Sequence, residues 1–399
     1  MTDPLENAYP KVGYQIVEWD MLKPPDERVM PLTHTNRLKL FEMSVRTDRN
    51  LTEYSLVDSL GNTYTEGDLN EASDTVDPAS VNEVVSDIAS SDGKSQRVAL
   101  AHLAKMAATS PDECIPAVDL VIELLSDSHP AVQGEALGIL TRVVESDPER
   151  TRAGVKPAIH LVDESTHSLL RNEAIQFLAE FADHDPTVVT DAIPQLARLL
   201  RDESTDTDST ARILASVGSS QPDALVDVVT KLELFLETEP ERAHVWVLRA
   251  IGHLSKEHAN VTVDVAPTAG ELLSTDQYTI RSNAAGVLAD IADEYPTEVK
   301  PWIPDVIELV QDPDELVRYN ATSILARVAK EYPDTVSPAT EELLAVLNDE
   351  SADTRFNACW ALKRLKATSA LETLTELAAT DPDEDVRSVA QMAIDSIEE

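Results

Sequence analysis

The feature that most constrains this chain is an internal repeat of about 37 residues, which two independent series of residues mark. Prolines recur at intervals of 36 to 38 residues, and one interval of 74 has Ala259 in the skipped position. An alanine upstream of the proline recurs with mostly the same spacing. The series are Pro111, Pro148, Pro186, Pro222, Pro296 and Pro333, and Ala99, Ala136, Ala174, Ala284, Ala321, Ala358 and Ala390. A fixed period of this length is typical of stacked repeat architectures.

Each unit is predicted to be a pair of helices. In residues 302–333 a first helix ends at the turn Asp312-Pro313-Asp314, and a second follows with apolar residues at the i, i+3, i+4, i+7 spacing. Pro333 ends the second helix, because proline lacks an N–H donor and clashes with the preceding turn. One pair cannot bury its apolar face alone, so pairs must stack into a continuous core. The pattern predicts an all-α solenoid of about eight to nine helix pairs over residues 81–399.

Three units share a motif in which an aspartate precedes an arginine by six residues and an alanine follows three residues later. The instances are Asp312/Arg318/Ala321, Asp349/Arg355/Ala358 and Asp381/Arg387/Ala390, while Arg171 and Arg281 keep the arginine without the aligned aspartate. This motif resembles that of the HEAT repeat. The resemblance covers residues 81–399 of the chain. The resemblance implies a right-handed superhelix with its second helices along the concave face. It also implies a scaffold or adaptor role, and it brings no catalytic residue with it.

The aspartates and arginines of this motif have two interpretations. A guanidinium can grip a phosphate or a carboxylate of a ligand. The favoured interpretation is structural: each arginine forks onto an aspartate of its own or the adjacent unit and ties the stack together. The residues of this structural ladder are Asp312, Arg318, Asp349, Arg355, Asp381, Arg387, Arg171 and Arg281.

The first eighty residues do not follow the repeat. Residues 54–64 are predicted to form two short strands around a Gly61-Asn62 turn, within a small β-containing segment over residues 1–65. Residues 66–80 are acidic, small and polar, which is typical of a linker. The segment either caps the first repeat, because an array must close its apolar end, or adds a separate contact surface.

The charge of the chain is strongly acidic, with 32 Lys+Arg against 73 Asp+Glu and a net charge of −41. The acids are spread along the chain, which resembles proteins of halophilic archaea, whose acidic surfaces stay hydrated in molar salt. A basic partner is the alternative reading. The chain starts without a secretory signal, has no long apolar run and contains two distant cysteines. A cytoplasmic protein without a membrane span is therefore expected.

The predicted second helices are nearly neutral, although the rest of the chain is acidic. Two readings remain open: the concave face contacts a partner, or the second helices are simply more buried. Arginine, lysine and aromatic residues are favoured in interface hot spots. The binding candidates are Arg355, Phe356, Trp360, Lys363, Arg364 and Lys366 at one end of the expected groove, and Arg97 and Lys105 at the other.

Motifs for chemistry are missing from the sequence. None of the zinc-protease, P-loop, dinucleotide or nucleophile-elbow patterns occurs, and no His-Glu dipeptide is present. We therefore expect a non-enzymatic scaffold that binds a protein partner along the concave face, without metal or cofactor. A nucleic-acid-associated factor that uses the basic cluster is a less favoured alternative. A HEAT-like lyase, hydroxylase or accessory subunit is another. The partner's identity and the oligomeric state stay open.

Overall fold

A computed structural model of the chain describes residues 55–57, 63–65, 84–86, 88, 93–126, 129–238 and 242–399. These residues fall into two compact units, and the division lies within one helix. The N-terminal unit ends at Ile213, and the C-terminal unit is Leu214–Glu399. Both units consist almost entirely of helices, as the sequence predicts.

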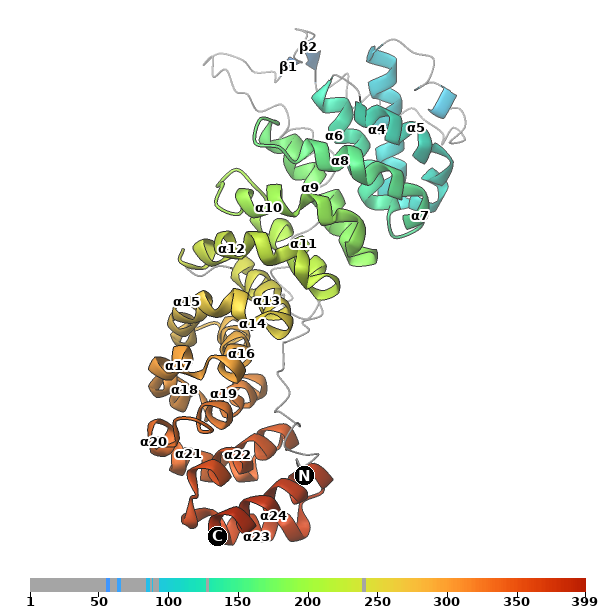
Figure 1. Cartoon of the computed structure of the whole chain (residues 1–399). Helices are drawn as coiled ribbons and strands as arrows, with labels where there is room; N and C mark the ends of the chain where they lie inside the picture. Colours follow the sequence, from blue (N-terminus) through green and yellow to red (C-terminus); the bar gives the residue numbers. More distant parts are fainter. Residues whose placement is uncertain are drawn as a thin grey trace. The chain divides into compact units, whose positions relative to one another are not determined.

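Nine of the described helices are 14 to 17 residues long, and they are the second helices of the repeat. They are α4 (Gly93–Thr109), α6 (Pro130–Val143), α9 (Ser168–His184), α11 (Thr207–Ser220), α13 (Arg242–Glu257), α16 (Tyr278–Glu294), α19 (Glu315–Val328), α22 (Ala352–Leu365) and α24 (Glu384–Glu398). In the C-terminal unit each packs against the next, from α13 to α24 (Figure 1). In the N-terminal unit α4 packs on α6, and α6 on α9.

The first arm of each unit is a run of short α and 3₁₀ segments, and its α segments lie where the sequence predicts the first helix of the pair. Prolines cause the interruptions: Pro301 and Pro304 lack the N–H that an uninterrupted helix needs. The recurring prolines also begin these segments, where a missing N–H is harmless. The segments of the N-terminal unit are η2 (Pro111–Ala117), α5 (Val118–Glu123), η3 (Leu124–Ser126), α7 (Pro148–Thr151), η4 (Arg152–Gly154), α8 (Val155–Leu161), η5 (Pro186–Ala192) and α10 (Ile193–Leu199).

The first arms of the C-terminal unit repeat the same arrangement. They are η6 (Pro222–Val228), α12 (Val229–Leu236), α14 (Ala259–Thr262), η7 (Val263–Val265), α15 (Ala266–Glu271), η8 (Leu272–Ser274), α17 (Pro296–Val299), η9 (Lys300–Trp302), α18 (Ile303–Leu309), α20 (Pro333–Val336), η10 (Ser337–Ala339), α21 (Thr340–Ala345), η11 (Val346–Asn348), η12 (Thr368–Ala370) and α23 (Leu371–Thr380). Ala259 begins α14 in the position where six other units have proline.

Small residues set how closely the segments approach one another. The recurring alanines of the second helices, such as Ala284, Ala321 and Ala358, are completely buried. Gly270 is a more extreme case, because a Cβ on it would lie 2.1 Å from the ring of Trp302. Only glycine therefore allows Trp302 to pack against α15 in the present way.

Burial explains why the second helices carry so little charge. Thirteen residues of α16 and eleven of α19 are buried, so few positions remain where an acidic side chain could reach solvent. Burial by itself is therefore enough to explain why these two helices carry so little charge. The handedness of a superhelix and its concave face concern the arrangement of the two units, and they stay predictions.

A small hairpin precedes the helices. Strands β1 (Ser55–Val57) and β2 (Thr63–Thr65) pair antiparallel, with Leu56 opposite Tyr64. They lie in the stretch for which the sequence predicts two strands around a turn. The remainder of the β-containing segment over 1–65, and the linker over 66–80, lie outside the described residues and stay predictions.

Candidate functional site

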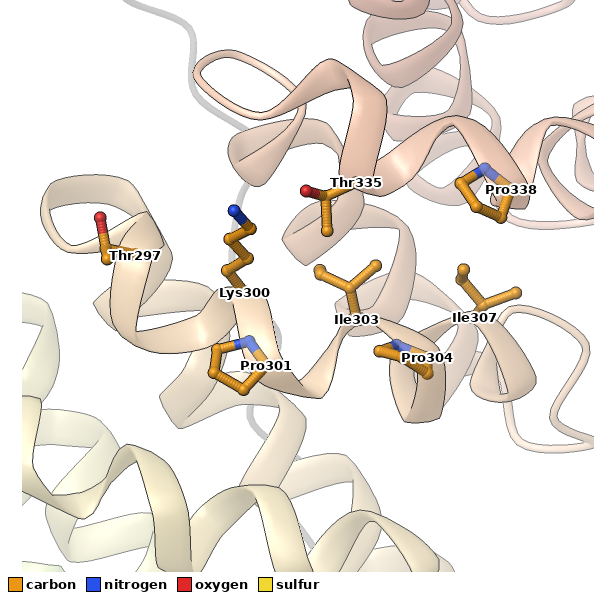
Figure 2. Close-up of a pocket in the computed structure, with 8 residues that line it drawn as sticks. All are labelled: Thr297, Lys300, Pro301, Ile303, Pro304, Ile307, Thr335 and Pro338. Atoms are coloured by element: carbon orange, nitrogen blue, oxygen red, sulfur yellow. The ribbon is translucent and has the colours of Figure 1, made fainter.

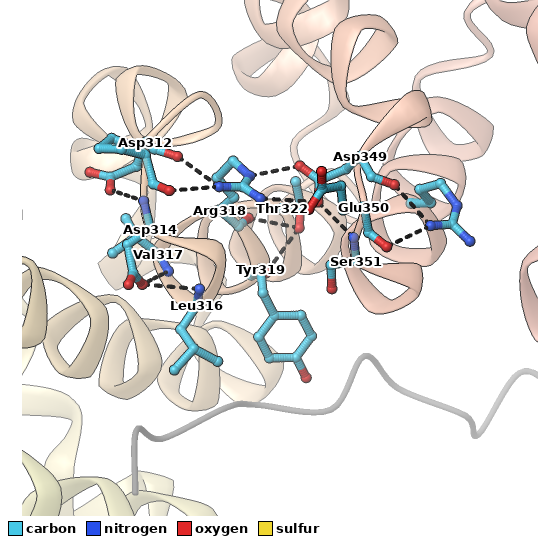
Figure 3. A network of polar contacts seen from close by, with 12 residues as sticks. Asp312, Asp314, Leu316, Val317, Arg318, Tyr319, Thr322, Asp349, Glu350 and Ser351 are labelled. Atoms are coloured by element: carbon cyan, nitrogen blue, oxygen red, sulfur yellow. Dashed lines mark hydrogen bonds and ion pairs between the residues drawn. The ribbon is translucent and has the colours of Figure 1, made fainter. Parts of the chain in front are cut away.

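The arginines of the repeat motif bind aspartates of the following unit. Arg318 Nε donates to Asp349 Oδ2 at 2.6 Å, and Nη2 donates to Oδ1 at 3.2 Å (Figure 3). Arg355 forks onto Asp381 in the same way, with both distances 2.8 Å. Arg281 reaches Asp312 at 2.9 Å from Nε. The ladder thus runs between units.

Each arginine also contacts its own unit, but through main-chain oxygens. Arg318 Nη1 donates to the carbonyls of Asp312 (3.0 Å) and Pro313 (3.1 Å). The carboxylate of Asp312 instead accepts from the backbone N–H of Asp314 and closes the turn (2.9 Å). The motif spacing therefore places the arginine over the turn of its own unit and aims it at the next one.

The ends of the ladder differ from its middle. Arg387 donates to the carbonyls of Asp381 and Pro382. In the N-terminal unit Arg171 is 3% exposed and donates to Asp202 (2.7 Å) and to Ser204 (2.8 Å). Asp202 belongs to none of the three instances of the sequence motif. Only the fold brings its carboxylate to Arg171.

The carboxylate of Asp381 is held ionised by the arginine that binds it. Burial acts to raise the pKa of Asp381, but the hydrogen bond and the charge of Arg355 outweigh it, and the pKa is lowered overall. Arg355 is 7% exposed, and four hydrogen bonds occupy it. Among the binding candidates it is therefore the one that the ladder already uses, and we do not carry it forward as a ligand-binding residue.

Asparagines form a second ladder that the sequence analysis missed. Asn283, Asn320 and Asn357 each donate from Nδ2 to a main-chain oxygen 38 residues earlier, at 3.2, 2.9 and 3.3 Å. All three are fully buried. Their signal was present in the sequence, because each lies two residues after a ladder arginine with a period of 37.

Aromatic and cationic residues of the predicted cluster do come together on and after α22. The rings of Phe356 and Trp360 meet edge to face, with their centroids 6.3 Å apart. Lys363 Nζ lies 4.4 Å from the centroid of the Trp360 ring, and the guanidinium carbon of Arg364 lies 5.2 Å from it. Trp360 is only 5% exposed, so it is a support for cations and not an open aromatic surface. We call Phe356, Trp360, Lys363, Arg364 and Lys366 the cation–aromatic cluster.

Lys366 is the residue of this cluster with a strained backbone. It follows α22 as its C-cap with φ 50° and ψ 44°, and its N–H donates to the carbonyl of Lys363 at 3.1 Å. Among the described residues it is the only non-glycine with a positive φ. Glycine is favoured at such a helix end, because a Cβ is strained there. The side chain of Lys366 is exposed.

Several buried hydrogen-bond donors on α19 and α22 have no partner among the described residues. They include the Tyr319 hydroxyl, the Ser323 hydroxyl and the indole N–H of Trp360. Tyr319 and Ser323 are one helical turn apart, and Trp360 occupies the register of Ser323 on the next second helix, which packs against α19. Figure 3 shows Tyr319 pointing away from the arginine ladder. We call these three residues the donor face.

The other predicted end of the groove lies on α4, in the N-terminal unit. Lys105 is exposed, and the side chain of Arg97 lies outside the described part of the chain. The structure therefore does not bring Arg97 and Lys105 into the unit that holds the cation–aromatic cluster.

A shallow, largely apolar pocket of about 380 Å³ lies between first arms of the C-terminal unit (Figure 2). Pro301, Ile303, Pro304, Ile307 and Pro338 supply much of its lining. The sequence analysis did not find it, because its lining comes from two successive first arms that only the fold brings together.

Groups with obvious reactivity are not assembled in the described residues. Burial raises the pKa of Cys114 to about 11 and of Cys359 to about 12, so both thiols stay protonated at neutral pH. Within the described ranges, His, Cys, Asp and Glu form no group of three that could hold a metal ion. The helices described there include none long and apolar enough to cross a membrane.

Comparison with known proteins places the fold. Residues 303–395 match the family model of HEAT repeats, and no curated protein matches the chain. An engineered protein solved by the Northeast Structural Genomics Consortium is 22% identical, with a TM-score of 0.60 over 80% of this chain and 99% of that one. A chain from a structure of the phosphorylation-controlled interaction between cadherin and beta-catenin is 17% identical. Its TM-score is 0.63, over 75% of this chain and 63% of that one.

These likenesses define a class of fold and nothing finer. The chain is a helical repeat protein in which short first arms alternate with long second helices. More closely, it is HEAT/armadillo-like, as the matched family model and the two similar structures agree.

Proposed function

We propose that the chain is a non-enzymatic scaffold that binds a segment of a partner protein along the second helices of its C-terminal unit. The donor face of α19 and α22 carries the proposal. An unsatisfied buried donor destabilises a protein, and native proteins retain few of them without a reason. Three such donors on two adjacent helices support a surface whose hydrogen bonds are completed by a partner.

The cation–aromatic cluster supports the same face. Tryptophan and arginine are among the residues most enriched in binding hot spots; here Trp360 belongs to the donor face, and Arg364 lies over its ring. Lys366 adds an independent argument, because strained residues persist where function needs them. A lysine at a position that favours glycine is consistent with a side chain that is in use.

A nucleic-acid partner is the second candidate, and the charges of Lys363, Arg364 and Lys366 favour it. Burial of Trp360 argues for the protein partner instead, because base stacking needs an open aromatic face. Affinity for nucleic acid would fall steeply and linearly with the logarithm of salt concentration, since phosphate contacts release counterions.

Affinity capture from a nuclease-treated lysate of the source cells tests the scaffold. The baits are the native chain, Lys363→Glu/Arg364→Glu, and the charge-matched control Lys156→Glu/Arg201→Glu, whose residues are exposed on the N-terminal unit. Cross-linking to captured proteins should place contacts on α19 and α22. Partners lost only with the first variant support the proposal; partners held equally by all three baits refute binding at this face.

We also propose that the chain works in a salt-rich cytoplasm. The supporting observation is the even spread of acids behind its net charge of −41. Salt screens repulsion between such charges, since the Debye length falls to about 3 Å at 1 M. Thermal unfolding should therefore shift to higher temperature in molar potassium chloride, and no shift would contradict this proposal.

A further inference from the structure

The pocket between the first arms has apolar walls whose shape is fixed before a ligand arrives. Pro301, Pro304 and Pro338 line it with exposed side chains, and Ile307 is half-buried in it (Figure 2). Because proline has a fixed φ, covering this surface costs little conformational entropy, which favours binding. The volume of about 380 Å³ is enough for one large side chain of a partner.

The preceding pair of first arms shows which side chain suits such a junction. There Trp302 packs on Gly270, where a Cβ would lie 2.1 Å from the ring. One period of 37 residues later, the corresponding residues are Ala339 and Ile307. The pocket lies at this later junction, where alanine stands in place of the tryptophan. An aromatic side chain supplied by a partner therefore resembles what the protein itself uses one unit earlier.

Acidic side chains dominate the two arms that form the pocket. Residues 296–310 and 333–348 contain six acids and one basic residue, Lys300, whose Nζ lies 4.7 Å from the centroid of the Tyr332 ring. The acids are Glu298, Asp305, Glu308, Asp334, Glu341 and Glu342. Within the described chain, none of these carboxylates forms a salt bridge. Their charge is therefore open to a partner, and it favours a cationic one.

Glu342 is the acid of this group with a buried carboxylate oxygen. Its Oε2 has no hydrogen-bond partner in the described part of the chain. Thr335 and Pro338, which line the pocket, lie seven and four residues before it in the unbroken run of α20, η10 and α21. This spacing places Glu342 on the same face as the two lining residues. An ionised carboxylate only accepts hydrogen bonds, so a positively charged donor beside the pocket would satisfy it.

We infer that this pocket docks a basic segment of a partner protein through one aromatic side chain. The aromatic ring enters between the prolines and Ile307, and an arginine or lysine next to it in the segment donates to Glu342. Further cations of the segment pair with Asp305 and Glu308. The surface consists of other residues than the donor face, so it is a second interaction site and does not depend on the function proposed above.

The test uses the full chain and the fluorescence anisotropy of a fluorescein-labelled peptide of alternating arginine and serine with one central tryptophan. One comparison peptide has glycine in place of the tryptophan, and another has glutamate in place of every arginine. All titrations share one concentration of potassium chloride, because salt screens charge attraction. The first peptide should bind best, and loss of its tryptophan should weaken it at least about tenfold, as expected for one buried aromatic side chain.

Two substitutions distinguish the pocket from the general acidity of the chain. Thr335→Trp fills the pocket with a ring of its own, and Glu342→Gln removes the buried charge. Each should weaken the peptide about tenfold. Each should also leave the melting temperature unchanged or raise it, because one buries apolar surface and the other replaces a buried charge by a neutral amide. Thr375→Trp and Glu164→Gln make the same changes at exposed positions and should not alter the affinity.

Each of the other outcomes would overturn the inference. Equal binding with and without the tryptophan would reduce the interaction to charge attraction alone. Tighter binding of the glutamate peptide would assign the site to Lys300 and to an acidic partner. A lower melting temperature of Glu342→Gln with unchanged affinity would make Glu342 a structural residue. Self-association of the native chain in analytical ultracentrifugation, lost in Thr335→Trp, would make a second copy the occupant.

Discussion

The interunit ladder makes a quantitative prediction at Arg355. The change Arg355→Met removes a guanidinium whose Nε and Nη2 bind Asp381, each at 2.8 Å. Both residues are buried, at 7% and 5% exposure, so Asp381 would keep its charge without a counterion. Breaking a buried ion pair in this way costs about 3–5 kcal/mol. The carbonyls of Asp349 and Glu350 lose their donor as well.

A second variant distinguishes the ion pair from packing. Arg355→Met/Asp381→Leu removes both charges, and the expected loss falls to about 1–2 kcal/mol. The loss that remains in the double variant comes from the turn, because the Asp381 carboxylate accepts from the N–H of Asp383 at 2.9 Å and leucine cannot. Arg150→Met is the matched control, because Arg150 pairs with Asp119 on the surface (40% and 71% exposed side chains). We expect it to leave stability nearly unchanged.

Hydrogen exchange of the amides in α22 and α24 is the assay, combined with urea unfolding at fixed salt concentration. Repeat units open locally, so the loss should appear first in these helices. Acid should mimic the substitution: the pKa of Asp381 is lowered in the folded state, so its contribution is present above the unfolded pKa and is lost as pH falls through the folded pKa. A loss below about 1 kcal/mol in the single variant, or equal losses in both, would refute the reasoning.

Three further predictions concern other positions. Gly270→Ala should destabilise by about 1–3 kcal/mol in thermal unfolding, because its Cβ would meet the Trp302 ring at 2.1 Å. Lys366→Gly should stabilise by about 1 kcal/mol in urea unfolding, because it relieves the strain of φ 50°. Burial, together with the neighbouring charges, lowers the pKa of His253 to about 4. Its contribution to stability is therefore complete above the unfolded pKa of 6.5 and is lost as pH falls toward 4, by up to about 1.4 kcal/mol per pH unit; His253→Gln should flatten this slope.

Each of these predictions has a matched control. Gly138→Ala should be tolerated, since its Cβ would make an ordinary contact of 3.5 Å with Arg142. Lys366→Ala keeps the strain and should bring no gain; an equal gain from alanine and glycine would contradict the backbone argument. Above pH 7 the native chain and His253→Gln should show the same slope, since neither folded nor unfolded His253 is protonated there; an unchanged slope below pH 6.5 in His253→Gln would contradict the assignment.

The part of the candidate site that lies within one helix could be predicted from the sequence. Phe356, Trp360, Lys363 and Arg364 lie within one helix, where spacing alone brings side chains three and four apart together. The donor face needed the packing of α19 against α22, because no local pattern marks a hydroxyl that lacks a partner. The burial of Trp360 could not be predicted from the sequence either, since it depends on which neighbouring side chains cover the ring.

The sequence by itself determined the repeat, because a period of 37 residues in prolines and alanines is a property of the chain. It also determined the second helices, whose apolar spacing is local. Only the tertiary structure decided how the units join. Arg318 has Asp312 six residues away in sequence, yet its guanidinium binds Asp349 of the next unit. The physical reason is that the carboxylate of Asp312 closes its own turn and accepts from Arg281 of the preceding unit, while stacking brings the carboxylate of Asp349 to hydrogen-bond distance of Arg318.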